Sequence, residues 1–453
     1  MSDRGTDAYN WITRHASDIH TLIASSSRSA TLVVAANDAS AKSKDMADYV
    51  CDGTADDVDI NAAITALPSG GGRVILTEGA YNITSTVAVD GKTDVILEGQ
   101  GWSSNIVAPS SGGLAKMVNL GKSGSVSTRC WVKNLKLTGN TGLTGTGDGL
   151  MFGAGANNTA VNCGAENIYI AGAKDSGIAI YGDNTRIVGC YSIGNGVNLY
   201  TSDVASDVEI LGGVYKDTIT SSSGEVFYLA GPRPRLIGIY AERSTTGQSN
   251  PELIDLKSTG IDALIMSNTF VVSHTTQSNG CLLGATGGRF IGNHIVSSST
   301  TTTAGAGIRI TAPNWIVNGT TFKWGTNMQA ISLESDATRI RISDCICTSG
   351  AWFVRLYDIA GDVDIINCHA NSSSVTDAIR IDTVTKAFNG LRIIGGSYTG
   401  LAGYALRYVE GGGNNIDYIY ASYSNFSGNT GGTHVGAVTG VNVAYTKVKG
   451  EDI

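Results

Sequence analysis

Two carboxylates and a phenol recur at a regular interval in the second half of the sequence. Glu334, Tyr357 and Asp382 each stand near the end of a short apolar run, and about two dozen residues separate one from the next. A chain that coils with this period places the three side chains on successive turns. Backbones two turns apart are separated by about 9.6 Å. Two carboxyl groups can then close to ~6.5–9.5 Å, the spacing at which one acid protonates a leaving oxygen while the other activates water.

Arginines accompany these residues. Arg355 and Arg380 precede Tyr357 and Asp382 by two positions, and residues two apart on a strand point to the same side. Their guanidinium groups could hold a substrate and keep a carboxylate ionised. Acids, rings and guanidinium groups along one elongated face suit a sugar polymer. The same alternation gives further outward residues, which we assign to substrate binding together with the two arginines: Asp255, Lys257, Arg309 and Arg407.

A purely structural explanation competes with this assignment. Outward strand positions are polar in most sheets, and opposite charges on neighbouring strands form ladders without any chemistry. The catalytic assignment of Glu334, Asp382 and Tyr357 is therefore a hypothesis, in which either carboxylate can take either role.

The elements that would carry these residues are short strands repeated along most of the chain. One series of apolar runs contains IRISDC (340–345) and its near-copy VDIINC (363–368), and a second series contains AISLES (330–335) and AIRIDT (378–383). Each series recurs about every 25 residues with Gly or Asn at the turns, which is typical of a solenoid whose repeats stack. The L-x-x-L-x-L-x-x-N frame of leucine-rich repeats is missing, so the pattern predicts an all-β solenoid.

Composition agrees with many short strands joined by tight turns. The 453 residues include 59 glycines, only 6 prolines and 15% charged residues, which favours strands over long helices. The formal charge of −8 argues against nucleic-acid binding, which needs a basic face.

No apolar stretch approaches the ~20 residues that cross a bilayer, and the first residues lack the apolar core of a secretory signal. We therefore expect no membrane insertion. We expect a protein that works outside a cell or on a virion, released by a route other than the classical signal peptide.

The segment TADDVDINAAITALP (54–68) has a different pattern from the repeats. Thr54 or Asp56 can cap a helix, the apolar residues fall on one helical face, and Pro68 stops it. A solenoid needs its first turn covered. The segment therefore predicts a short amphipathic helix that caps the N-terminal end.

The residues before this helix predict a separate segment. Residues 9–23 could form another helix, and residues 36–45 have the composition of a linker. We therefore divide the chain into residues 1–45, a helix and linker that could attach the body to a particle, and residues 46–453, a single solenoid domain.

The stretch DGTADDVDINAAITALPSGGGRVILTEGAYNI (52–83) resembles the opening of the pectate-lyase-like right-handed parallel β-helix superfamily. In that superfamily D-x-x-x-A-I-x-A, then G-G-x-V and G-x-Y, lead into the helix. The match is specific for residues 48–101, and the repeats extend it in pattern to about residue 445. The resemblance implies a right-handed parallel β-helix with a short N-terminal capping helix, and it implies the fold more strongly than any one chemistry.

The superfamily contains polysaccharide lyases, glycoside hydrolases, epimerases and phage tailspikes, so three functions stay open. The outward carboxylates favour a tailspike-like depolymerase that hydrolyses the glycosidic bonds of a polysaccharide. In a lyase or epimerase, Arg355 or Arg380 would neutralise a uronate while Tyr357 or Lys257 abstracts a proton. In a non-catalytic adhesin or structural spike, the same face would bind glycan without cleaving it.

The eight cysteines show no spacing typical of metal ligands. Cys190, Cys345 and Cys368 follow the last Ile or Val of their repeats, where other repeats have Gly213 or Gly396, so we expect small buried fillers. Cys345 and Cys368 would be neighbours in a stack, which also leaves a disulfide open.

The second series of apolar runs lacks the clustered aspartates that hold calcium. We therefore expect no metal and no cofactor.

The first series carries an apolar residue one step beyond its buried Ile. On a flat strand this position faces outwards and forms a stripe too long for the surface of a monomer. Either a kinked corner buries the stripe, or subunits pack on it. Because phage spikes of the resembled superfamily are usually trimers, we expect a homotrimer. The residues assigned to the stripe are Val188, Leu211, Ile237, Ile291, Val317, Ile366 and Ile394.

Overall fold

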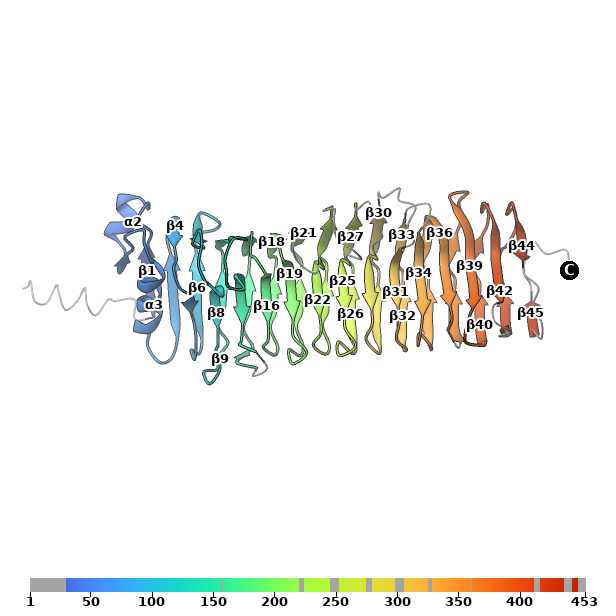
Figure 1. Cartoon of the computed structure of the whole chain (residues 1–453), viewed down its shortest axis with the longest axis horizontal. Coiled ribbons are helices and arrows are strands. Elements are labelled where there is room, and N and C mark those ends of the chain that lie inside the picture. The colour runs from blue at the N-terminus through green and yellow to red at the C-terminus, as the bar shows by residue number, and fades with distance from the viewer. Residues whose placement is uncertain are drawn as a thin grey trace, which may run out of the picture.

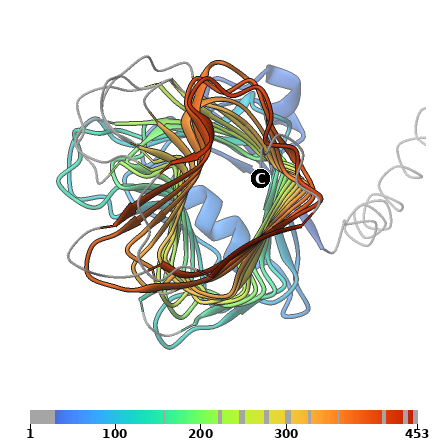
Figure 2. The ribbon, with the colours of Figure 1, turned by 90° about the vertical axis from the view of Figure 1, so that its right-hand side faces the viewer.

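The chain winds as an elongated parallel β-solenoid. Our computed structural model describes residues 30–155, 158–219, 224–244, 252–273, 279–297, 305–324, 328–359, 361–410, 416–435 and 442–446. Successive turns lie side by side along the long axis (Figure 1) and superimpose around one core when viewed down that axis (Figure 2). The helix predicted at residues 9–23 lies outside the described residues.

Most turns contribute one strand to each of three parallel sheets, which we name A, B and C. Sheet A has 17 strands. They are β1 (Thr31–Ala35), β2 (Tyr49–Val50), β3 (Gly72–Leu76), β6 (Val95–Gly99), β10 (Trp131–Lys133), β14 (Gly164–Glu166), β17 (Arg186–Val188), β20 (Glu209–Leu211), β23 (Arg235–Ile237), β26 (Ala263–Met266), β29 (Gly288–Ile291), β32 (Trp315–Asn318), β35 (Ile340–Ser343), β37 (Gly361–Ile366), β40 (Phe388–Ile394), β43 (Ile416–Ser422) and β45 (Asn442–Thr446).

Sheets B and C together have 26 strands and share β36 (Ile346–Tyr357), which runs through the corner between them. Sheet B otherwise contains β4 (Gly79–Asn82), β7 (Ser104–Val107), β11 (Lys136–Thr138), β15 (Tyr169–Ala171), β18 (Tyr191–Asn195), β21 (Val214–Thr218), β24 (Tyr240–Arg243), β27 (Thr269–Val272), β30 (His294–Ser297), β33 (Thr321–Lys323), β38 (His369–Ala370) and β41 (Ser397–Tyr398).

Sheet C contains β5 (Val87–Ala88), β8 (Lys116–Leu120), β12 (Asp148–Phe152), β16 (Ser176–Ile180), β19 (Val197–Thr201), β22 (Phe227–Leu229), β25 (Ile254–Leu256), β28 (Cys281–Leu283), β31 (Ala306–Ile310), β34 (Gln329–Glu334), β39 (Val375–Thr383), β42 (Tyr404–Glu410) and β44 (Gly432–Val435). A separate pair is formed by β9 (Ser127–Thr128) and β13 (Ala160–Val161).

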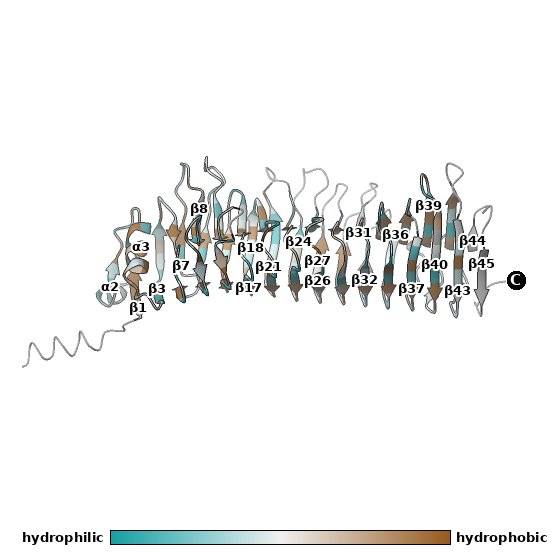
Figure 3. Cartoon of the chain, turned by 90° about the horizontal axis from the view of Figure 1, so that it is seen from below, coloured by the Kyte–Doolittle hydropathy of each residue, from teal (hydrophilic) through white to brown (hydrophobic). Residues whose placement is uncertain are grey.

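The core is built from columns of like residues. Ile342, Ile365 and Ile393 lie opposite one another on adjacent strands of sheet A, and all three are fully buried. Hydrophobic and polar residues alternate along the strands, as the colouring of Figure 3 shows. Burying each isoleucine contributes roughly 1.5–3 kcal/mol, and a slip of one residue would expose the whole set. The repeat therefore fixes the register, and the predicted all-β solenoid is confirmed.

The cysteines are small core residues, as the repeats predicted. All eight are buried and free, so Cys345 and Cys368 form no disulfide. The thiols of these two donate weakly to backbone carbonyl groups. Burial raises the pKa of the Cys190 thiol to about 12, so this thiol stays protonated and unreactive at neutral pH.

The helix α3 (Asp57–Ala66) covers the N-terminal end of the core. Ile60, Ala63 and Ile64 are buried, and the helix is seen inside the ring of strands in Figure 2. Asp56 stands at the N-cap position. Its carboxylate accepts hydrogen bonds from the backbone N–H groups of Gly53 (2.9 Å) and Asn82 (2.7 Å) and so ties the helix to the first turns. The predicted capping helix is confirmed.

The solenoid begins before residue 46, where we had placed its boundary. The strand β1 pairs in parallel with β3, and Val34 and Ala35 are buried. The short helix α2 (Ala41–Asp45) occupies the segment that we expected to be a linker, and Ser40 caps it by accepting a hydrogen bond from the backbone N–H of Ser43. The apolar run TLVVA extends the sheet here because its side chains reach the same core.

The apolar stripe on sheet A faces outwards and is half-buried. Strand pairing aligns Val188, Leu211 and Ile237 in one row, which continues through Met266 and Ile291. Ile366 and Ile394 lie further along the same row.

Our assignment of Val317 to this stripe was wrong, and the sequence analysis missed Met266. Val317 is fully buried, and Asn318 occupies the outward position. The residues of β32 pair with those of β29 one position away from the alignment that the sequence pattern predicts, so Val317 lies opposite the buried Phe290. This offset moves Val317 to the inner side of the pleat.

Candidate functional site

The outer face of sheet C brings together the residues that the sequence nominated for chemistry. One outward row contains Glu334, Tyr357 and Asp382 on β34, β36 and β39. The three residues therefore occupy one face of adjacent strands, in the register that the repeat predicted. A second outward row, two positions earlier along each strand, contains Asp255, Leu282, Arg309, Ser332, Arg355, Arg380 and Arg407.

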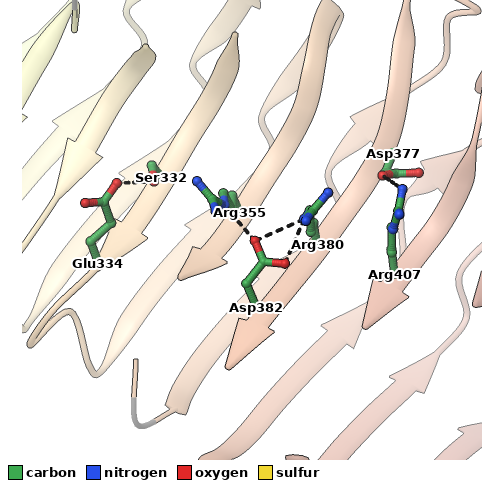
Figure 4. Close-up of polar contacts among 7 residues, drawn as sticks. All are labelled: Ser332, Glu334, Arg355, Asp377, Arg380, Asp382 and Arg407. Carbon is green, nitrogen blue, oxygen red and sulfur yellow. Dashed lines mark hydrogen bonds and ion pairs between the residues drawn. The ribbon is translucent and has the colours of Figure 1, made fainter. Parts of the chain in front are cut away.

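Asp382 is held by two arginines (Figure 4). Its Oδ1 accepts a hydrogen bond from Nε of Arg380 at 2.8 Å. Its Oδ2 accepts one from Nε of Arg355 at 2.8 Å and one from Nε of Arg380 at 3.0 Å. Because only 6% of the Asp382 side chain is exposed, this ion pair is largely shielded from water, which makes its loss costly.

Glu334 is engaged in the same way. Its Oε2 accepts hydrogen bonds from Nε (2.9 Å) and Nη2 (2.7 Å) of Arg309, and its Oε1 accepts one from the hydroxyl of Ser332 at 2.8 Å. Arg355 lies between Glu334 and Asp382 in Figure 4. Both oxygens of each carboxylate therefore already accept hydrogen bonds from neighbouring side chains, and the two carboxylates do not face each other directly.

Two aromatic rings orient the arginines of this cluster. The guanidinium group of Arg355 lies 4.3 Å from the ring centre of Tyr357 and 5.3 Å from that of Trp352, and Arg380 lies 4.7 Å from the Trp352 ring. Such stacking fixes the planes of the guanidinium groups. The sequence analysis missed Trp352 because it stands three residues before Arg355, and alternation on a flat strand would separate them. Phe353 and Val354, which lie between them, are both fully buried, so the alternation is interrupted there and Trp352 and Arg355 face the same side.

The remaining predicted binding residues also have partners. Asp255 pairs with Lys257, two residues further along the same face. Arg407 lies 3.5 Å from the carboxylate of Asp377, which is fully buried. The outer face of sheet C is therefore a network of paired charges rather than a row of free ones.

Tyrosines continue this face towards the N-terminus. The rings of Tyr200 and Tyr228 stack with their centres 5.1 Å apart, and Tyr181 lies 5.6 Å from Tyr200. The ammonium group of Lys257 lies 4.8 Å from the centre of the Tyr228 ring. The three rings are half-buried and link the charged part of the face to an aromatic part.

Two buried glutamates beside this face escaped the sequence analysis. Glu225 and Glu252 are 8% and 7% exposed and stand just before β22 and β25. The pKa of Glu252 is raised to about 7, mainly by burial and also by the charges of Asp255 and Glu225, while a hydrogen bond from Asn279 opposes the rise. A sequence signal existed, since the runs EVFYLA and ELIDLK both open with Glu, but nothing in the sequence showed that these positions are enclosed.

Folding stability is expected to decrease as the pH rises through the range in which Glu252 ionises. A glutamate in the unfolded chain titrates near pH 4.5, whereas Glu252 in the folded chain titrates near pH 7. Between these values the folded chain binds more protons, so the free energy of unfolding falls as pH rises, and the loss is complete above about pH 7. The Glu252→Gln protein should therefore be more stable than the wild type at about pH 8, by on the order of 2 kcal/mol.

Urea denaturation of both proteins at about pH 5 and about pH 8 measures this difference. The wild type should lose more stability between the two pH values than the variant does. The same pH dependence in both proteins would show that Glu252 ionises at an ordinary pH in the folded chain.

Within the described ranges, no group of three or more His, Cys, Asp or Glu side chains could hold a metal ion. Among the described residues, no helix is long and apolar enough to cross a membrane.

Comparison with known proteins shows the fold. No protein-family model matches the sequence, and no curated protein is similar to it. A tailspike mutant of E. coli bacteriophage HK620 in complex with a hexasaccharide matches with a TM-score of 0.54 and 12% identity, over 86% of this chain and 73% of the tailspike chain. A second mutant of the same tailspike gives a TM-score of 0.51 at 12% identity, over 86% and 74% of the chains. The A-module of the Azotobacter vinelandii mannuronan C-5 epimerase AlgE4 gives 0.45 at 15% identity, over 86% and 97%.

The two tailspike structures confirm that this chain has the right-handed parallel β-helix fold that its residues 48–101 resemble.

Proposed function

We propose that this chain binds a polysaccharide along the outer face of sheet C and hydrolyses a glycosidic bond there. The observation that carries the proposal is the continuity of this face: strand pairing aligns tyrosines, carboxylates and arginines in outward rows from β19 to β42. Rings stack on sugar faces, and guanidinium forks hold hydroxyl or carboxylate groups. The matching tailspike structure contains a hexasaccharide, which supports a glycan as the ligand.

In this proposal the arginines bind the substrate. Arg355 and Arg380 have fixed orientations because they stack on Trp352, and Arg309 and Arg407 extend the same row. The hypothesis from the sequence, in which Glu334 and Asp382 form the catalytic pair with Tyr357 between them, is tested with amide variants.

A lyase or epimerase is the second candidate for this face. Burial lowers the pKa of Lys257, but the hydrogen bond and the charge of Asp255 outweigh it, so the pKa of Lys257 lies above its usual value. A lysine that keeps its proton is a poor base. This observation weakens the version of the lyase mechanism that uses Lys257 and leaves Tyr357 as the candidate base.

The test is incubation of the purified protein with a panel of acidic and neutral polysaccharides, read by product size and by ultraviolet absorbance together. Hydrolysis predicts shorter products without new absorbance. Shorter products that absorb in the ultraviolet identify a lyase. Binding without any change in size identifies an adhesin. Activity that survives both Glu334→Gln and Asp382→Asn removes these residues as the catalytic pair.

We further propose that the protein is a homotrimer whose subunits cover the apolar stripe of sheet A. The support is the row of half-buried apolar residues from Val188 to Ile291, which a monomer would leave in contact with water. We also propose that it acts outside the cell or on a virion, where polysaccharide substrates are found.

The Ile237→Glu protein is expected to dissociate into monomers, because a charge in a packed apolar interface has no partner there. Sedimentation velocity measures the change, and Ile346→Glu is the control, since Ile346 is 42% exposed on a different sheet. A wild-type protein that sediments as a monomer at micromolar concentration contradicts the trimer.

A further inference from the structure

Three carboxyl groups gather where sheet B passes into sheet C. The backbone N–H of Val226 donates to the carbonyl oxygen of Glu252 at 3.3 Å, so Glu225 and Glu252 occupy matching positions before β22 and β25. Asp255 follows on β25. We name Glu225, Glu252 and Asp255 the carboxyl cluster. Burial lowers the pKa of Arg243, at the end of β24, to about 10, and the charges of both glutamates oppose this change.

The cluster contains buried oxygens without hydrogen-bond partners. Glu225 is 8% exposed and Asp255 is 4% exposed, yet Oε2 of Glu225 and Oδ1 of Asp255 accept no hydrogen bond within the described part of the chain. Leaving a buried polar atom unsatisfied costs about 1–3 kcal/mol. The cluster retains two such atoms and so offers acceptor sites to a ligand that carries hydroxyl groups or water.

One side of the cluster opens to the outer face of sheet C. The side chain of Lys257, which pairs with Asp255, is 39% exposed. Its ammonium group lies over Tyr228, and Tyr228 stacks on Tyr200. A sugar that binds beside these tyrosines would therefore lie next to Asp255, which is opposite Tyr228 on the adjacent strand.

The three carboxyl groups differ in their surroundings. Glu252 accepts one hydrogen bond, from the side-chain amide of Asn279 at 3.3 Å, and forms no ion pair within the described part of the chain. Asp255 is paired with the ammonium group of Lys257. Two neighbouring carboxyl groups in unlike environments take opposite roles in proton transfer, with the one that forms no ion pair as acid and the cation-paired one as base.

We propose that the carboxyl cluster is the proton-transfer centre of this protein, with Glu252 as the acid and Asp255 as the base; this assignment rests on the glycan hydrolysis proposed above. Glu252 gives its proton to the glycosidic oxygen as the bond from that oxygen to the anomeric carbon breaks. A water molecule forms the new bond to the anomeric carbon and gives a proton to the carboxylate of Asp255. The proton then returns through solvent to Glu252, so the net change is addition of one water.

The geometry of the chain is compatible with an inverting reaction. Glu252 and Asp255 are three residues apart, and three residues of extended chain span at most roughly 10 Å. A carboxyl spacing of ~6.5–9.5 Å leaves room for the attacking water.

The test compares Glu252→Gln and Asp255→Asn with the wild type on the polysaccharide that the panel identifies. Each change is expected to lower the rate of reducing-end release by ~10²–10⁴-fold. The matched control is Asp57→Asn, because Asp57 is also a buried carboxyl group (3% exposed) but lies in α3, away from sheet C. Circular dichroism and thermal melting confirm that each variant is folded.

An aryl glycoside distinguishes a catalytic acid from a structural residue, because its leaving group departs without being protonated. On an aryl glycoside of the same sugar, Glu252→Gln should regain most of the wild-type rate, whereas Asp255→Asn should not. The high-pH limb of the wild-type rate profile should also disappear in Glu252→Gln.

Rates within about fivefold of wild type in both variants overturn the assignment. If Glu334→Gln or Asp382→Asn then abolishes cleavage, the proposed hydrolysis stands and only the location of the proton-transfer centre changes. If the wild-type protein cleaves none of the polysaccharides, the proposed function fails and the assignment fails with it.

Discussion

The Asp382→Asn protein is expected to be less stable than the wild type by ~2–4 kcal/mol and to keep its glycan hydrolysis within about tenfold. The change removes the one negative charge that Arg355 and Arg380 share, and it leaves two guanidinium groups without that partner. Removing one member of a fully buried ion pair costs about 3–5 kcal/mol. The arginine side chains are 21% and 20% exposed, so water offsets part of this cost.

Urea denaturation and initial rates on the same preparation test both parts of this expectation. Glu334→Gln is the matched control: Glu334 has one arginine partner, and its side chain is 18% exposed against 6% for Asp382. The Glu334→Gln protein should therefore lose only ~1 kcal/mol of folding stability. A loss of hydrolysis by ~10³-fold with unchanged stability would instead identify Asp382 as a catalytic residue.

The Gly213→Ala protein is expected to lose about 3 kcal/mol of folding stability or more. Gly213 joins β20 to β21 with φ at +99°, and an added Cβ would lie 2.3 Å from the carbonyl oxygen of Cys190. That oxygen accepts the hydrogen bond from the backbone N–H of Val214 at 2.9 Å. The methyl group therefore opposes the pairing of two turns as well as the backbone conformation.

Gly212→Ala separates these two contributions. Gly212 also has a positive φ, at +64°, but an added Cβ would meet no atom within 4 Å. Only the conformational cost remains, about 1 kcal/mol. Thermal melting at one fixed scan rate compares the two variants. Equal losses in both would show that the contact with Cys190 relaxes without cost.

These predictions distinguish two parts of the outer face of sheet C. In the C-terminal part, Glu334 and Asp382 have their oxygens occupied by arginines and Ser332, so the charges are used to order binding groups. In the part around β22 and β25, buried carboxyl oxygens lack partners and aromatic rings lie beside them. In our proposal, substrate binding and proton transfer therefore occupy neighbouring segments of one face.

The sequence by itself determined the winding of the chain and the register of its strands. A period of two dozen residues with alternating apolar positions leaves one alignment that buries Ile342, Ile365 and Ile393 together. The same alignment places Glu334, Tyr357 and Asp382 on one face. The same reasoning misplaced Val317, because one residue more or less at a corner moves a side chain to the other side of the pleat.

Only the tertiary structure decided which partners the charged side chains have. Asp382 binds Arg355 from the preceding strand, Trp352 stacks on the arginines because the alternation of β36 is interrupted, and Glu252 is buried near Asp255. Register follows from a pattern summed over many repeats, so a sequence can specify it. The charge state and availability of one carboxyl group depend on the few side chains from other strands that surround it, and these contacts exist only once the turns have stacked.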